Sequence, residues 1–231
     1  MKVPIISSHR LCAVILSAGA SSRMGQEKAL LPWPPFADGK GATLLSASIA
    51  ALKPFAEAVL VVAGHNAQSI APVVAANGAS MVQNPAPERG QFSSLQVGLQ
   101  EVLARGCDAA MITLVDSPPL CESSMQSLIA AFERALVNCK WAVAPEHHGK
   151  RGHPLIATRA LIDAFLAAPV TSNAREVKRA HAEKFESVPV PDELLCVDVN
   201  TPEQYAALSR SASKPSQRTG SEVRNEKQPS S

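Results

Sequence analysis

Short apolar runs and amphipathic stretches alternate along most of this chain. Three runs are mostly apolar and are bounded by small or polar residues: Leu11 to Leu16, Ala58 to Ala63 and Cys107 to Val115. Runs of this length and composition are typical of strands that are buried on both faces of a parallel sheet. From Gln91 to Ala104, apolar residues recur at helical spacing along one face. The pattern therefore predicts strands that alternate with helices.

The remaining elements follow the same alternation. We expect further helices at residues 43–52, 66–76, 122–136, 160–167, 174–182 and 202–208, and further strands at 79–83, 141–144, 185–190 and 194–197. This order indicates an α/β fold, with a Rossmann-like, mostly parallel sheet and helices on both faces, in a single domain. We assign residues 11–209 to that domain, residues 1–10 to an N-terminal extension and the polar residues 210–231 to a disordered tail.

Composition limits the partners of this domain. The 231 residues carry a formal net charge of +2, which is too small to suggest a nucleic acid or a membrane surface as partner. No apolar stretch approaches the roughly 18 residues of a membrane-spanning helix, and the first ten residues lack the apolar core of a secretory signal. The five cysteines are scattered without a C-x-x-C pair, which favours a reduced, cytoplasmic setting.

The loop that follows the first strand has the composition of a phosphate site. It reads Ser-Ala-Gly-Ala-Ser-Ser-Arg-Met-Gly-Gln-Glu-Lys over residues 17–28. Small residues let backbone N–H groups approach a polyphosphate closely, and the side chains of Arg23 and Lys28 would neutralise its charge. The loop also begins at the carboxyl end of a strand, where open α/β sheets bind their ligands. It lacks the Ser or Thr that follows the lysine of a Walker A loop, and it lacks the three glycines of a dinucleotide fingerprint.

Carboxylates follow two other expected strands. Asp116 comes directly after the third apolar run, so it lies beside the same crevice as the loop. Mg²⁺ binds one or two carboxylates together with phosphate oxygens, which makes Asp116 a candidate ligand. Asp198 follows the strand expected at 194–197. Either residue has the alternative of shaping a turn or capping a helix.

Two serines lie near the start of the helix expected at 91–104. The hydroxyls of Ser93 and Ser94 have two alternative roles, since they either bind a phosphate or nucleobase edge or simply cap the helix.

Residues 16–32 resemble the signature L-x-A-G-x-S-x-R-M-G-x-x-K-x-L-L-P of the MobA-like nucleotidyltransferases, and the most similar branch is that of the molybdenum cofactor cytidylyltransferases. Two later segments carry the same resemblance. Asp116-Ser117-Pro118 is similar to the family's G-D-x-P motif, with Val115 in place of the usual Gly. Residues 198–204 are similar to its D-[IV]-[DN]-T-P-[ED]-[DQ] terminus. The resemblance covers about residues 11–209.

The resemblance implies roles for particular residues. It implies catalysis by Arg23, Lys28 and Asp116, and binding of Mg²⁺ by Asp116 with Asp198, for which Asn200 is the alternative. It implies nucleotide contacts by Ser17, Ala18, Gly19, Ala20, Ser22, Arg23, Lys28, Ser93 and Ser94. The flexible basic loop at 149–154 is similar to the family's G-x-x-G-H-P motif. Together with the polar turn at residues 171–175, which precedes a late helix, this motif implies acceptor contacts by Arg151, His153 and Arg175.

The reaction that the resemblance implies is attack by an acceptor phosphate on the α-phosphorus of an NTP, with pyrophosphate leaving. Because such a nucleophile is already anionic, catalysis would rest on alignment and charge neutralisation. Ala18-Gly19 stands where the guanylyl branch carries Gly-Gly, which favours CTP. The implied acceptor is molybdopterin carrying molybdenum, with a molybdoenzyme apoprotein as a further partner. The alternatives are GTP or another NTP, a sugar or alditol phosphate acceptor, and a non-catalytic module that delivers cofactor to a molybdoenzyme.

Overall fold

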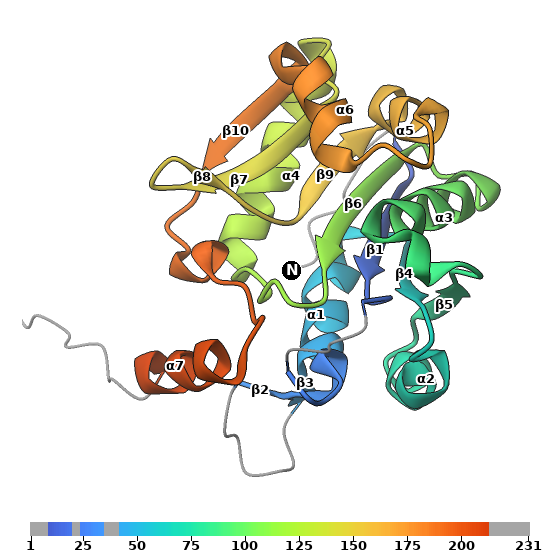
Figure 1. The fold of residues 1–231 in the computed structure, drawn as a ribbon. Coiled ribbons are helices and arrows are strands. Elements are labelled where there is room, and N and C mark those ends of the chain that lie inside the picture. Colours follow the sequence, from blue (N-terminus) through green and yellow to red (C-terminus); the bar gives the residue numbers. More distant parts are fainter. Residues whose placement is uncertain (1–8, 20–23, 35–41, 213–231) are drawn as a thin grey trace, which may run out of the picture.

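The computed structural model describes residues 9–19, 24–34 and 42–212, in which strands and helices alternate (Figure 1). The strands are β1 (Leu11–Leu16), β2 (Pro32–Trp33), β3 (Ala42–Thr43), β4 (Ala58–Ala63), β5 (Ser80–Gln83), β6 (Ala109–Leu114), β7 (Ala142–His147), β8 (Lys150–Arg151), β9 (Leu155–Thr158) and β10 (Phe185–Pro189). The α-helices are α1 (Leu44–Leu52), α2 (Ala67–Ala76), α3 (Gln91–Ala104), α4 (Glu122–Val137), α5 (Arg159–Ala167), α6 (Ala174–Ala180) and α7 (Pro202–Ala212). Short 3₁₀ helices are η1 (Lys28–Leu30), η2 (Lys53–Phe55), η3 (Pro87–Arg89), η4 (Ala182–Lys184) and η5 (Glu193–Cys196).

One mixed sheet forms the centre of the molecule. Its strand order is β10-β7-β9-β6-β1-β4-β5, and β8 joins it by pairing with β7. β1 runs parallel to both β4 and β6, β4 to β5, and β10 to β7, whereas β9 is antiparallel to β6 and β7. The expected α/β fold with a mostly parallel sheet in a single domain is confirmed.

Helices cover both faces of this sheet because side chains alternate along each buried strand. On one face, α1, α2 and α4 pack against residues such as Ile15, Val61 and Met111. On the other face, α3 and α5 pack against residues such as Val14 and Val62. The strands therefore have two apolar faces, which explains why they appear in the sequence as continuous apolar runs.

The order of the strands places a ligand crevice at the end of β1. From β1 the chain passes to β4 and β5 on one side, and it then crosses to β6 on the other side of β1. Such a reversal opens a crevice at the carboxyl ends of the strands, where open α/β sheets bind ligands. Ala18 follows β1 and Asp116 follows β6, so both lie at this crevice.

Two expectations about the C-terminal half are corrected. The strand expected at 194–197 is instead the 3₁₀ helix η5, because the Asp192 carboxylate accepts a hydrogen bond from the N–H of Leu194 and starts a turn there. Residues 149–154 were expected as a flexible loop, but β7 and β8 form a hairpin through His148 and Gly149, which both have positive φ. A two-residue turn of this kind matches the twist of the flanking strands. Strand β9 was also missing from the prediction.

The limits expected for the domain, residues 11 and 209, stay predictions. Helix α7 continues to Ala212, past the expected domain end at residue 209. Residues 1–8 of the expected extension and 213–231 of the expected tail lie outside the described residues. Among the helices that the structure describes, none is both long enough and apolar enough to cross a membrane.

Gly98 allows α3 to lie directly on the sheet, and its replacement tests this packing. A Cβ atom at Gly98 would lie 2.8 Å from Val14 Cγ1 and 2.8 Å from Val62 Cγ2. We expect Gly98→Ala to lower the free energy of unfolding by about 1–2 kcal/mol, since an overpacking cost of up to about 3 kcal/mol outweighs the roughly 1 kcal/mol that Ala gains in a helix. Urea denaturation measures the change, with the exposed Gln100→Ala of the same helix as control. An unfolding free energy equal to or above that of the parent chain would contradict this packing.

Candidate functional site

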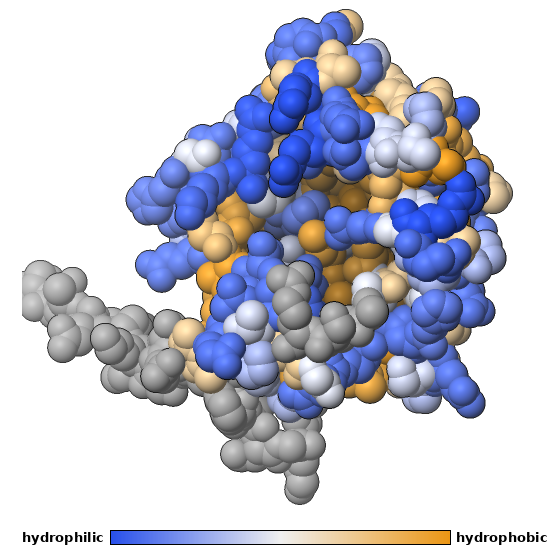
Figure 2. Space-filling view, in the orientation of Figure 1, coloured by the Kyte–Doolittle hydropathy of each residue, from blue (hydrophilic) through white to orange (hydrophobic). Residues whose placement is uncertain are grey.

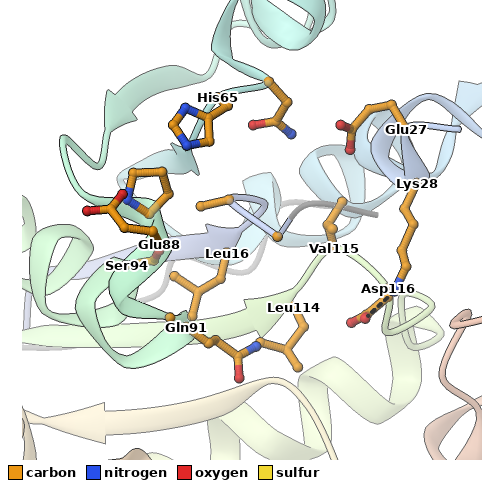
Figure 3. A pocket seen from close by; sticks show the side chains of 15 residues that line it. Leu16, Glu27, Lys28, His65, Glu88, Gln91, Ser94, Leu114, Val115 and Asp116 are labelled. Carbon is orange, nitrogen blue, oxygen red and sulfur yellow. Dashed lines mark hydrogen bonds and ion pairs between the residues drawn. The ribbon is translucent and has the colours of Figure 1, made fainter. Parts of the chain in front are cut away.

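A cavity of about 600 Å³ opens at the carboxyl ends of β1 and β6. Figure 2 shows a central hollow with an apolar floor and a hydrophilic rim. Figure 3 shows the cavity from close by, with Leu16 and Leu114 on its floor and Lys28 pointing toward Asp116. The loop after β1 contributes Ala18 and Gly19 to the lining, as the sequence predicts for a phosphate site.

Lys28 connects two residues that are distant in sequence. Its Nζ donates a hydrogen bond to Asp116 Oδ2 at 3.0 Å and another to Asn200 Oδ1 at 2.8 Å. The backbone N–H of Val199 also donates to the carbonyl of Asp116 at 2.9 Å, which holds this segment beside the end of β6. The structure thus places Asn200 at the Lys28–Asp116 pair. The Asp198 carboxylate is exposed and has no hydrogen bond to any described residue.

A small apolar cluster holds Lys28 in place. Met24 and Leu31, two apolar residues of the signature, are buried against Leu44 at the start of α1 and against Tyr205 of α7. The Tyr205 hydroxyl also donates to the carbonyl of Pro32 at 2.6 Å. The C-terminal helix therefore anchors the segment that carries Lys28, and this explains why the signature contains apolar residues.

The charges that line the first cavity are mostly negative among the described residues. They are the carboxylates of Glu27, Glu88 and Asp116 and the ammonium of Lys28. A triphosphate alone would meet repulsion here, so additional positive charge is needed to bind it. The described residues contain no cluster of three or more His, Cys, Asp or Glu residues that could hold a metal ion. Asp116 Oδ2 and Asn200 Oδ1 both face the Lys28 ammonium, however, so a Mg²⁺ ion held by these oxygens and by phosphate oxygens would take the place of that ammonium.

Ala18, which lines the first cavity, is packed between two other segments. A Cβ atom at Gly64 would lie 2.8 Å from the Ala18 carbonyl oxygen, 3.0 Å from Pro87 Cβ and 3.2 Å from Ala18 Cβ. The Asn66 amide, which follows Gly64 in the chain, donates to the carbonyl of Ser17 at 2.8 Å. The absent side chain at Gly64 thus lets the segment after β4 fix the position of the loop.

The two serines of α3 lie close together but differ in their access to the cavity. The Asn84 amide donates to both hydroxyls, at 2.9 Å each, and the Ser93 hydroxyl donates to the carbonyl of Gly90 at 2.8 Å. Ser94 lines the first cavity, and Ser93 does not. The side chain of Ser93 therefore ties the start of α3 to the end of β5, whereas Ser94 faces the space where a ligand would lie.

Of four further residues expected to contact the nucleotide, the structure describes only Ser17. Ala20, Ser22 and Arg23 lie outside the described residues. Ser17 is buried behind the cavity, and its hydroxyl has no hydrogen-bond partner among the described residues. Its backbone N–H donates to the carbonyl of Val62, so Ser17 helps to hold the loop against β4.

A second cavity of about 330 Å³ adjoins the first. The two cavities share four lining residues, which are Leu16, Gly90, Gln91 and Leu114. The floor of the second cavity contains Phe92 and Phe165, whose rings meet edge to face at 6.3 Å between centroids. His153 lines this cavity, and the sequence had placed it among the acceptor contacts.

His153 is held in one tautomer. Its Nδ1 lies 3.3 Å from the carbonyl oxygen of Ile112, which can only accept, so Nδ1 carries the proton. Burial lowers the pKa of His153, and the charge of Lys178 lowers it further, although the Ile112 carbonyl, Asp198 and Asp116 act in the opposite direction. The ring is therefore neutral at pH 7, and Nε2 presents a lone pair that can accept a hydrogen bond from a ligand.

The two arginines expected on the acceptor side do not line either cavity. Arg151 of β8 donates from Nε to the Ser187 hydroxyl at 2.6 Å and lies 3.8 Å from the Glu146 carboxylate. Arg175 is exposed on α6. Sequence reasoning missed Lys178 of the same helix, which does line the second cavity. The helical spacing from Arg175 to Lys178, one turn on the same side, was the available signal.

The buried, neutral state of His153 has a consequence for stability. In the unfolded chain the imidazole takes up a proton near its ordinary pKa of about 6.5, but in the folded chain burial resists protonation. Acid therefore favours the unfolded state. We expect the free energy of unfolding to fall more between about pH 7.5 and about pH 5.5 in the parent chain than in His153→Gln. Urea titrations at several pH values measure this, with the exposed His65→Gln as control. Parallel profiles for the parent and His153→Gln would rule out this effect.

Comparison with known proteins agrees with the fold. The model of the MobA-like NTP transferase domain matches residues 13–185. The molybdenum cofactor cytidylyltransferase of Escherichia coli (strain K12) is 24% identical over 193 residues, covering 83% of this chain and 92% of that protein. The molybdenum cofactor guanylyltransferase of Rhodobacter capsulatus is 30% identical over 206 residues, covering 85% of this chain and 94% of that protein.

A solved structure shows the same fold. A nucleotidyl transferase from Methanothermobacter superposes with a TM-score of 0.68 at 20% identity, covering 89% of this chain and all of that one. The domain match extends from β1, through the Lys28 and Asp116 segments, to the start of β10. This chain belongs to the MobA-like NTP transferase family and is a nucleotidyltransferase.

Proposed function

We propose that this enzyme transfers CMP from CTP to the terminal phosphate of molybdopterin carrying molybdenum. An oxygen of the acceptor phosphate forms the new bond to the α-phosphorus. The bond from the α-phosphorus to the bridging oxygen breaks, and pyrophosphate leaves with that electron pair. The nucleophile needs no proton removed when the acceptor phosphate is a dianion, so the protein supplies alignment and positive charge.

The observation that supports this proposal most is the contact of Lys28 with Asp116 and Asn200 at the cavity. An ammonium at this point would bind phosphate oxygens and stabilise the charge that develops on the leaving pyrophosphate. Arg23, which lies outside the described residues, is proposed to assist it. Ala18 and Gly19 would let backbone N–H groups approach the nucleotide.

We propose Mg²⁺ as the metal that accompanies the nucleotide. Asp116 would hold it, with Asn200 as the second protein ligand, since both side-chain oxygens already bind one cation, the Lys28 ammonium, which would then move onto the phosphates. Asp198, the ligand first expected, stays a candidate, since its exposed carboxylate makes no hydrogen bond with the described residues. When bound, the ion would neutralise phosphate charge, which the three carboxylates lining the cavity otherwise oppose.

Ala18 supports CTP over GTP. The relatives include both a cytidylyltransferase and a guanylyltransferase, so the choice of base depends on the site itself. Ala18 lines the first cavity together with Pro87. A methyl group at position 18 takes space that a glycine would leave to the base, and this supports the smaller pyrimidine over a purine.

Two alternatives to the proposal are separated from it by different experiments. A sugar or alditol phosphate acceptor would be converted by the same residues, so only a comparison of acceptors separates it. A non-catalytic module that delivers cofactor to a molybdoenzyme apoprotein would bind CTP without releasing pyrophosphate. The intact Lys28–Asp116 pair favours an active enzyme.

Asp116→Asn tests the role of the carboxylate. We expect acceptor-dependent pyrophosphate release from CTP and Mg²⁺ to fall by about 10²–10³-fold, because the metal ion that would neutralise the phosphates loses its carboxylate ligand. Asp163→Asn, which removes an exposed carboxylate of α5, serves as control and should keep activity within about twofold. Retention of more than about a fifth of the parent rate by Asp116→Asn would remove this residue from the mechanism.

Ala18→Gly tests the choice of base. Loss of one methyl group from the lining of the first cavity should raise the ratio of kcat/KM for GTP to that for CTP by about tenfold. Ala76→Gly, at an exposed position at the end of α2, is the matched control and should leave the ratio unchanged. An unchanged ratio in Ala18→Gly, or a parent enzyme that prefers GTP, would overturn the assignment to CTP and leave the chemistry intact.

A further inference from the structure

Lys178 stands out in the second cavity because its ammonium is partly buried without a partner. No described residue makes a hydrogen bond or an ion pair with it. Burial lowers the pKa of Lys178, and the charges of Arg175 and Arg151 lower it further. Three cationic side chains from β8 and α6 therefore act on the same region. A charged group in such surroundings is costly unless an anion joins it.

The second cavity has the charge of an anion site. Of its described lining residues, the charged ones are Arg89 and Lys178, and no carboxylate is among them. The first cavity differs, since Glu27, Glu88 and Asp116 line it. The two cavities thus suit different ligands, one a metal-bound phosphate chain and the other a phosphate that binds to protein cations directly.

The floor of the second cavity adds a requirement for the ligand body. Phe92, Leu155 and Phe165 form an apolar surface below Lys178 and His153. A flat or apolar ring would bury its surface there, and the neutral Nε2 of His153 would accept a hydrogen bond from an N–H or O–H group on it. The nucleotide triphosphate does not fit this description, because Lys28 and Asp116 lie in the first cavity.

We propose that Lys178 binds the phosphate monoester of the acceptor, and that its ring system lies on the apolar floor beside His153. This inference rests on the proposed function, since it assigns the second cavity to the acceptor of that reaction. Leu16 and Leu114 line both cavities, so a phosphate bound in the second cavity near them would lie next to a nucleotide bound in the first. Lys178 binds the oxygens of the acceptor phosphate other than the one that attacks the α-phosphorus, and it transfers no proton.

Phenyl phosphate tests the inference without any turnover. It carries a monoester phosphate and a flat ring, and isothermal titration calorimetry measures its binding to the folded apoprotein. We expect Lys178→Met to weaken binding by about tenfold or more, because a hydrogen bond to a charged group is lost. Arg179→Met removes a charge from the next position of α6, where the side chain is exposed, and should change binding by less than about twofold. Lys28→Met, which removes the ammonium of the first cavity, shows whether the probe binds there instead.

Three results of the titration would overturn the inference. They are equal binding by Lys178→Met and the parent, loss of binding in Lys28→Met instead, and no binding by the parent. Thermal unfolding of each variant separates a folding defect from a binding defect. Lys178→Arg should keep most of the affinity if the charge is what the phosphate requires.

Initial rates then connect Lys178 to the reaction. With molybdenum-loaded molybdopterin as the varied substrate, Lys178→Met should raise the acceptor KM by about tenfold and leave the CTP KM within about twofold. A change confined to the CTP KM would contradict the assignment. If the parent releases no pyrophosphate, the proposed function fails, but the phenyl phosphate titration still decides the role of Lys178.

Discussion

The ammonium of Lys28 joins three parts of the chain that are far apart in sequence. It binds Asp116 at the end of β6 and Asn200 just before α7, while its own segment follows β1. The hydrogen bond from Tyr205 of α7 to the carbonyl of Pro32 holds the segment of Lys28 against the C-terminal helix. The first cavity therefore depends on the sheet, the signature segment and the C-terminal helix together.

The described charged side chains are mostly negative in the first cavity and positive in the second, so the cavities suit different ligands. Carboxylates line the first, so it suits a phosphate chain that carries a metal ion. Cations and an apolar floor line the second, so it suits an anionic group on a flat body. Since Leu16 and Leu114 belong to both, the sheet itself sets how two substrates would approach each other. Alignment on a rigid support of this kind is what a reaction with an anionic nucleophile needs.

The sequence was sufficient wherever one local pattern determines the structure. The buried runs predicted β1, β4 and β6, and the end of β6 correctly located Asp116. It was insufficient where contacts between distant segments decide. A capping carboxylate turns residues 193–196 into a 3₁₀ helix, and only the fold shows that Asn200, rather than Asp198, contacts Lys28. Lys178 lies one helical turn after Arg175, but only the fold shows that Lys178, and not Arg175, lines a cavity.

The central claim is that Asp116 and Asn200 form one metal and phosphate site with Lys28. A crystal structure with α,β-methylene CTP and Mn²⁺, which scatters anomalously and replaces Mg²⁺, tests it most directly. The account predicts an anomalous peak within about 2.0–2.3 Å of an Asp116 oxygen, with the Asn200 oxygen or its bound water beside it and Lys28 on the phosphates. A peak bound elsewhere, with the Lys28–Asp116 contact intact and the phosphates distant from both, would contradict the account.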